Sequence, residues 1–160
     1  MADREVVVER RIAAPAERVW RVLTDLAGAP AVLSGVEAVE VLSDGPFGVG
    51  TRWRETRRML GKEATEEMWV TASDPPRGYT VEAASRGAAH RSRFTLRPAG
   101  PGATDVRMSF TAVPPGGAAG LPARVFGALG ARLVSRAVAR DLADVAAAAE
   151  RAGPGSPGTV

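Results

Sequence analysis

Apolar and polar residues alternate in six short segments through the middle of the chain, and a turn signal ends each segment. The segments are residues 36–42, 51–60, 63–72, 79–85, 89–97 and 104–113. A two-residue alternation is typical of β-strands with one face in water. Because short connections such as Gly61-Lys62 join them, the pattern predicts an antiparallel meander. A β-rich run at residues 4–12 predicts one further strand at the start.

Two regions outside the meander have helical periodicity instead. The first follows Pro15, a residue that suits an initial helical turn, and has Val19, Trp20 and Leu23 at helical spacing. We expect a helix there and a short second helix over Ala29–Leu33.

The longest apolar stripe predicts a C-terminal helix over residues 118–151. At 1.5 Å per residue this helix is roughly 50 Å long. The stripe consists of Leu121, Val125, Leu129, Leu133, Ala137, Leu142 and Val145. Gly127 and Gly130 lie inside it, each at a cost of about 1 kcal/mol relative to alanine. A kink and the close packing of another element explain these glycines equally well.

The composition is that of one globular domain. Apolar residues make up 45% of the 160 residues and charged residues 24%, which is enough for a core of ordinary size. We place the domain at residues 1–152, because residues 153–160 are rich in Gly, Pro and Ser and are expected to form a disordered tail. No apolar run resembles a signal peptide or a membrane span, so we expect a cytoplasmic protein.

The charges argue against a nucleic-acid partner. The net charge of +3 comes from 21 basic and 18 acidic residues that are interspersed, and the arginines mostly alternate with apolar residues. This pattern indicates a solvated sheet face. The chain has no cysteine and one histidine, which excludes disulfides, thiol nucleophiles and His-rich metal sites. We therefore expect no metal, no cofactor and no nucleic acid.

The single histidine, His90, lies in a segment whose two faces separate cleanly. Successive strand residues point to opposite sides of a sheet, so Arg91 and Arg93 share one face, and His90, Ser92 and Phe94 share the other. An unpaired buried guanidinium is too costly, which places the arginines outside and His90 inside. A register slip of one residue reverses this assignment.

The same alternation brings charged residues to the inner face. Outward arginines on the second of the six segments carry Glu55 and Arg57 inward, and an inward Met68 carries Glu66 with it. Trp69 then faces outward, which is unusual for a tryptophan. Buried charges are usually paired or functional, although hydration near the strand ends also explains Glu55 and Arg57.

Three stretches, and the order of the predicted elements, resemble one known superfamily. The stretches read "ERRIAAPAERVWRVLTD", "GVGTRWRET" and "EEMWVTASDPPRGYTVEA". They are similar to the START-like superfamily, which includes polyketide cyclases and dehydrases and lipid-transport proteins. The resemblance covers about Val6 to Ala149. It implies an α+β helix-grip fold, in which a curved antiparallel sheet of about seven strands wraps around a long C-terminal helix and two short helices follow the first strand.

The resemblance also implies a pocket between sheet and helix for an apolar or amphipathic small molecule. The expected ligand-binding residues lie on the inner face or on the last helix. They are Trp53, Glu55, Arg57, Met59, Met68, Tyr79, Val81, His90, Ser92, Phe94, Met108, Phe110, Phe126, Leu129 and Leu133.

Three functions follow as hypotheses for a monomer or homodimer. The first is binding of a hydrophobic, lipid-like or polyketide-like molecule. The second is a polyketide cyclase or dehydratase in which His90 acts as a base with Glu55 or Glu66. The third is a protein-interaction module, as in co-chaperone or toxin-like relatives, with the arginine-rich outer sheet as its surface.

Overall fold

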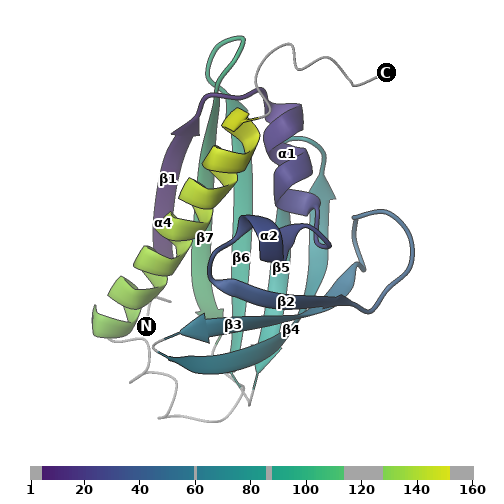
Figure 1. The fold of residues 1–160 in the computed structure, drawn as a ribbon, viewed down its shortest axis with the longest axis vertical. Helices are drawn as coiled ribbons and strands as arrows, with labels where there is room; N and C mark the ends of the chain where they lie inside the picture. The colour runs from purple at the N-terminus through teal and green to yellow at the C-terminus, as the bar shows by residue number, and fades with distance from the viewer. Residues whose placement is uncertain (1–4, 60, 86–87, 114–127, 152–160) are drawn as a thin grey trace.

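A computed structural model describes residues 5–59, 61–85, 88–113 and 128–151. In chain order its elements are β1 (Glu5–Ile12), α1 (Ala16–Thr24), α2 (Ala29–Val32), β2 (Val36–Val41), β3 (Arg52–Met59), β4 (Lys62–Asp74), β5 (Gly78–Ser85), β6 (Ala88–Pro98), β7 (Thr104–Val113) and α4 (Ala128–Arg151) (Figure 1). These strands form one antiparallel sheet in the order β1-β7-β6-β5-β4-β3-β2. The first strand therefore pairs with the last.

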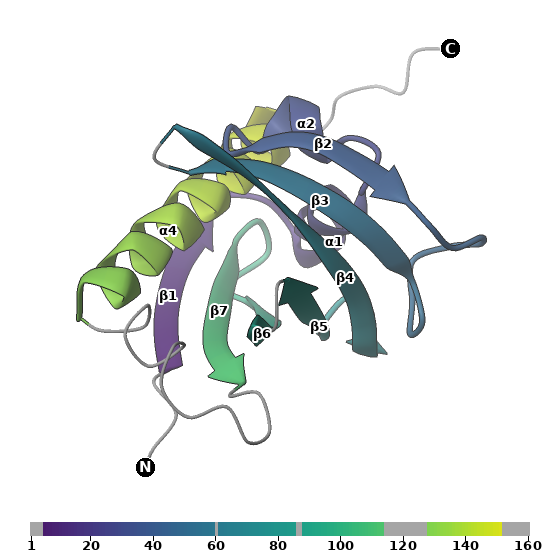
Figure 2. The ribbon, with the colours of Figure 1, turned by 90° about the horizontal axis from the view of Figure 1, so that it is seen from below.

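The sheet curves around α4. Figure 2 shows α4 beside β1 and β7, while β4, β3 and β2 continue the curve on the other side. The helix α4 packs against β1 and α1, and α2 packs against β2. This is the helix-grip arrangement that the resemblance implied, and the seven predicted strands agree with the observed ones to within two residues at each boundary.

The start of the predicted C-terminal helix and the predicted tail both lie outside the part of the chain that the structure describes. They are residues 118–127, which include Gly127, and residues 153–160. Gly130 is helical within α4. Among the described residues, no helix combines the length and the hydropathy that crossing a membrane requires.

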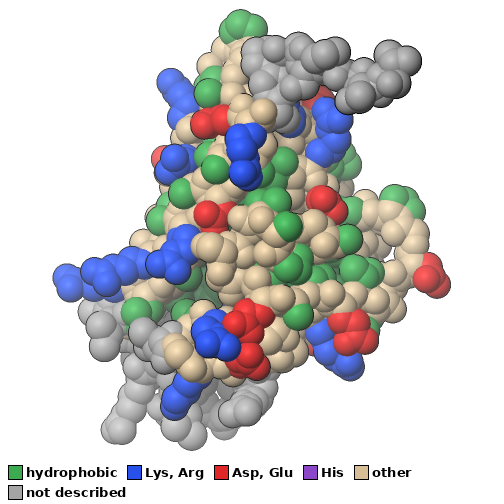
Figure 3. All heavy atoms as spheres, in the orientation of Figure 1, with side chains coloured by type: hydrophobic (Ala, Val, Ile, Leu, Met, Phe, Trp, Pro, Cys, Tyr) green, Lys and Arg blue, Asp and Glu red, His purple; other side chains and the backbone are tan. Residues whose placement is uncertain are grey.

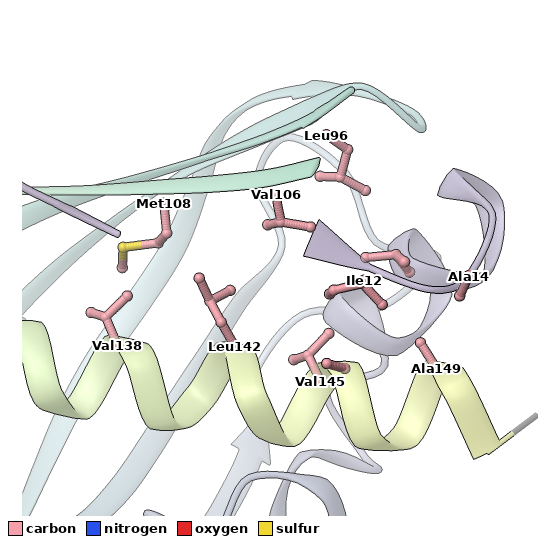
Figure 4. Close-up of a cluster of buried hydrophobic side chains, with 11 residues drawn as sticks. Ile12, Ala14, Leu96, Val106, Met108, Val138, Leu142, Val145 and Ala149 are labelled. Atoms are coloured by element: carbon pink, nitrogen blue, oxygen red, sulfur yellow. The ribbon is translucent and has the colours of Figure 1, made fainter. Parts of the chain in front are cut away.

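The larger hydrophobic cluster lies where the sheet closes on α4. Val138, Leu142 and Val145 project from one side of the helix toward β7 and β1 (Figure 4). Ile12 and Val106, which they meet, are completely buried. Each such aliphatic side chain stabilises the fold by about 1.5–3 kcal/mol relative to an exposed position. The cluster thus joins the first strand, the last strand and the C-terminal helix.

A second, aromatic cluster lies under the other half of the sheet. Its buried members are Trp53, Val70, Tyr79 and Val81. Tyr79 stacks on Phe94 with ring centroids 4.6 Å apart, and Trp20 of α1 meets Tyr79 edge-on at 5.5 Å. Such pairs contribute about 0.5–1.5 kcal/mol beyond the area they bury, so α1 is fixed on the sheet by its tryptophan.

The outer face of the sheet carries paired charges, as the alternation predicted. Arg91 lies 2.8 Å from Glu82, and Arg52 pairs with Glu67. Arg52 also lies over the ring of Trp69, 5.0 Å from its centroid, which explains an outward tryptophan as a cation–π partner. On the face drawn in Figure 3, basic and acidic side chains lie next to each other along the edge where β3 and β4 run.

Candidate functional site

The inner face of the sheet changes from apolar to polar along the strands. We define the apolar end as Trp53, Val70, Tyr79, Phe94 and Leu96. We define the polar end as Glu55, Arg57, Glu66 and His90, together with Asp141 of α4. Strand register produces this division, because Glu55 lies opposite Glu66, while Trp53, two residues earlier on β3, lies opposite Met68.

At the polar end, His90 and Glu66 form a hydrogen bond across an intervening strand. Nε2 of His90 on β6 is 2.9 Å from Oε2 of Glu66 on β4. Between them, β5 presents Ala83 opposite His90, and the alanine side chain is too short to block the contact. Burial raises the pKa of Glu66, but the hydrogen bond and charge of His90 and the charge of Arg57 outweigh burial and lower it. The carboxylate is therefore ionised at neutral pH, and Nε2 donates the proton.

The other imidazole nitrogen of His90 has a different environment. Nδ1 is buried and has no hydrogen-bond partner among the described residues. The ring lies 4.6 Å from that of Phe110, and the His90 side chain is 14% exposed. Because Nε2 donates to Glu66, Nδ1 of the neutral ring is an acceptor. A buried acceptor without a partner costs about 1–3 kcal/mol, which a donor group on a ligand would relieve.

Arg57 holds two carboxylates at once. Its Nη1 and Nη2 atoms donate to the two carboxylate oxygens of Asp141 at 3.1 and 2.8 Å, and its Nε donates to Glu55 at 2.5 Å. Burial lowers the pKa of Arg57, but Glu55 and Asp141 outweigh that effect and raise it. The bidentate pair ties α4 to β3, and each guanidinium nitrogen is directed at a carboxylate of the protein itself.

The neighbourhood of Asp141 is rich in negative charge. Burial raises the pKa of Asp141, and Glu55 and Asp144 add to this effect against the opposing pull of Arg57. Asp144, one turn further along α4, accepts hydrogen bonds from the backbone N and Oγ of Ser34 at 2.9 and 2.8 Å. The helix is thus tied both to β3 and to the turn before β2.

Tyr79 borders the polar end from the apolar side. Its side chain is buried, and burial, together with the charges of Glu55 and Asp141, raises the pKa of its hydroxyl. The hydroxyl therefore remains protonated at neutral pH.

With this geometry in view, the comparisons with known proteins assign the family. The family model described as polyketide cyclase / dehydrase and lipid transport matches residues 3–150. The chain belongs to this family. A comparison with curated proteins found no match.

Solved structures share the fold of this polyketide cyclase / dehydrase and lipid transport family member. The Zhui aromatase/cyclase from Streptomyces sp. R1128 is 23% identical with a TM-score of 0.82, covering 99% of this chain and 100% of its own. TTHA0849 from Thermus thermophilus is 24% identical with a TM-score of 0.75, covering 94% and 100%. A START superfamily protein from Mycobacterium smegmatis is 15% identical with a TM-score of 0.77, covering 94% and 99%. At these identities the likeness concerns the fold alone.

Most of the predicted site residues lie on the inner face of this family fold. Glu55 is only 8% exposed, so hydration at a strand end does not explain it. Met59 differs from expectation, because it is 42% exposed. It is the last residue of β3, and only Lys62 at the start of β4 lies across from it, so little packs over it. The remaining inner-face residues are buried or half-buried: Trp53, Arg57, Met68, Tyr79, Val81, His90, Ser92, Phe94, Met108 and Phe110.

The other three predicted ligand-binding residues are those expected on the C-terminal helix. Phe126 lies outside the described residues, the side chain of Leu129 is not described, and Leu133 is half-buried on α4. Sequence reasoning missed Asp141, which completes the polar end. Its signal was a carboxylate directly before Leu142 of the apolar stripe.

A separate hollow of about 380 Å³ lies near the β4–β5 turn. Its lining comes from residues 72–74, 77–80 and 93–95. Outward residues such as Thr80 and Arg93 line it together with Tyr79 and Phe94 of the apolar end. The residues of the polar end do not line it, so the hollow is distinct from the polar end. The described residues contain no group of three or more His, Asp or Glu placed to hold a metal ion.

Proposed function

We propose that this protein binds a hydrophobic or amphipathic small molecule on the inner face of the sheet, beneath α4. The observation that carries the proposal is the division of one inner face into an apolar end and a polar end. Met68, Phe94 and Phe110 lie along this face and are only half-buried, so apolar surface remains for a ligand to cover. Burial of such surface yields about 25 cal/mol per Å², and a few polar groups set orientation.

The family supports the same proposal. Its description joins polyketide cyclases and dehydrases with lipid transport, and polyketides and lipids are both largely apolar molecules. Fold alone does not choose among them, so the proposal rests on the side chains of the inner face.

Native mass spectrometry of the protein purified from its own source, followed by denaturing extraction, tests the proposal. We expect one small hydrophobic molecule at near one per chain. The variant Ala83→Phe fills the inner face beside His90, because Ala83 is 1% exposed and lies between Met68 and His90. It should lose the molecule. The matched control Ala84→Phe changes the next, outward residue of the same strand and should keep it. Equal binding by both variants would contradict the proposal.

The hydrogen bond between His90 and Glu66 favours catalysis as a second candidate function. A histidine oriented by a carboxylate is the arrangement of a general base near neutral pH. Here Nδ1 of His90 would take a proton from carbon next to a ketone of a polyketide-like chain, as cyclisation or dehydration requires, and Glu66 would stabilise the imidazolium. An enzyme should lose turnover on His90→Ala while it still binds the substrate. A carrier should change only in affinity.

A further inference from the structure

The polar end has more carboxylates than cations within the described residues. Glu55, Glu66 and Asp141 face a single guanidinium, that of Arg57, and His90 supplies at most one further positive charge. Glu55 and Glu66 are direct cross-strand neighbours on β3 and β4, and opposed like charges on one sheet face repel each other. The charge of Arg57 also lowers the pKa of Glu66, so the five groups form one continuous patch.

Arg57 is not positioned to receive an anionic ligand. All three of its nitrogens donate to Glu55 or Asp141 at 2.5 to 3.1 Å. These bonds use three of its five N–H hydrogens, and two protein carboxylates already offset its single positive charge. A ligand carboxylate would therefore add a third negative charge to this partly buried group, which is unfavourable.

The groups that a ligand meets instead suit an uncharged donor or a cation. Oε2 of Glu66 accepts from His90 at 2.9 Å, and the Glu66 side chain remains 34% exposed. Beside it, Nδ1 of His90 is buried and has no partner among the described residues, and it accepts a hydrogen bond when the imidazole is neutral. A hydroxyl or an ammonium can donate to such acceptors, whereas a carboxylate, which only accepts, cannot.

We infer that the site selects by charge, taking apolar molecules with a hydroxyl or amine at their polar end and rejecting those with a carboxylate. This inference rests on the proposed binding function and names the chemistry of its ligand. Fatty acids and other anionic amphiphiles are therefore poor ligands, although their chains suit the apolar end as well as those of alcohols.

Three probes of equal chain length separate charge from hydrophobicity: dodecanol, dodecylamine and dodecanoate. Each competes, near pH 7.5, with the uncharged fluorescent probe N-phenyl-1-naphthylamine for the purified protein. We expect dodecanol and dodecylamine to displace the probe with affinities about tenfold or more above that of dodecanoate. A tenfold ratio of affinities requires only a modest repulsion between the carboxylate of dodecanoate and the carboxylates of the polar end. Equal or tighter binding of dodecanoate would overturn the inference and leave the proposed binding function standing. If neither the probe nor any amphiphile binds, the proposed function fails and the inference fails with it.

Two variants locate the selectivity at the polar end. Glu66→Gln keeps the shape of the side chain and removes one negative charge, so the preference for dodecanol over dodecanoate should fall several-fold. Asp141→Asn removes a partner of Arg57 and should reduce the preference in the same direction. The matched control Glu67→Gln changes the next residue of β4, which pairs with Arg52 on the outer face, and should leave the ratio unchanged. An equal shift in Glu67→Gln would mean that net charge, and not the polar end, sets the preference.

Discussion

The apolar end and the polar end lie on the same strands, yet different forces hold them. At the apolar end, Tyr79 and Phe94 stack at 4.6 Å, and contact with apolar neighbours removes surface from water. At the polar end, Arg57 is shared between Glu55 and Asp141, and the cost of taking these charges out of water offsets much of their attraction. The comparison teaches that stability comes mainly from the apolar packing, whereas the paired charges add less to stability and suit the selective role proposed above.

The largest effect should come from the apolar packing on α4. Leu142 is 1% exposed and contributes to the larger hydrophobic cluster. Leu142→Ala should lower the free energy of unfolding by about 2–5 kcal/mol, because it removes buried surface and leaves a cavity. Urea unfolding measures the change. Val7→Ala, at a position that is 40% exposed, is the control and should cost about 0.5 kcal/mol or less. Equal losses of unfolding free energy in the two variants would contradict the claim that buried apolar packing is the main source of stability.

A smaller loss should follow when the polar end loses its cation. Arg57→Met leaves Glu55 and Asp141 close together without a partner. Since fully buried pairs cost about 3–5 kcal/mol to break, and the Arg57 side chain is 25% exposed, we expect the lower limit of that range or less. The double variant Arg57→Met/Asp141→Leu should recover part of the loss in the same unfolding assay. If the double variant is less stable than the single one, the carboxylate of Asp141 is not the source of the cost.

The pH dependence of the stability should separate the charges of the polar end from the packing of the apolar end. The pKa of Glu66 in the folded protein lies below its ordinary value of 4.5. A lowered folded-state pKa stabilises the protein above the unfolded-state value, and this stabilisation disappears as the pH falls through the folded-state value. Glu66→Gln should therefore be less stable than the wild type at neutral pH, and the difference should shrink below pH 4.5. Thermal unfolding across this range measures it. A difference that is independent of pH would assign the effect to packing.

The smallest effect should come from the outer face. Arg52→Ala removes the cation over Trp69 and the pair with Glu67, and exposed interactions of these kinds contribute about 0.5–1 kcal/mol each. Ligand binding on the inner face should not change. A loss of binding in Arg52→Ala would mean that the two faces of the sheet are coupled.

The fold and the facing of the strands could be predicted because arginine is costly to bury. Arg91 and Arg93 had to meet water, and this requirement alone turned His90 inward. On β3, the alternating arginines that face water turned Glu55 and Arg57 to the inner face, and the structure has both residues there. The same reasoning placed Met59 there too, but alternation along a strand says nothing about how much packs over its last residue.

The sequence offered Glu55 and Glu66 as partners of His90 but could not choose between them, because the contacts of the polar end depend on how separate elements are aligned. Glu66 reaches His90 only because the register across β5 puts Ala83 beside the imidazole. The pairing of β4 and β5 shifts between Val70 and Ala72, and sequence alternation does not reveal such an irregularity. Asp141 meets Arg57 through the placement of α4 over the sheet, which no local pattern encodes.

The pairing of β1 with β7 has a consequence for biosynthesis. Ile12 is buried only when residues as distant as Val106 and Val145 surround it, so the chain cannot complete its core while it is still being translated up to α4. The inner face of the sheet therefore stays exposed until α4 has been synthesised. Contacts between residues distant in the sequence also form slowly. Nascent chains that stop before α4 therefore expose a wide apolar surface, and such species aggregate readily.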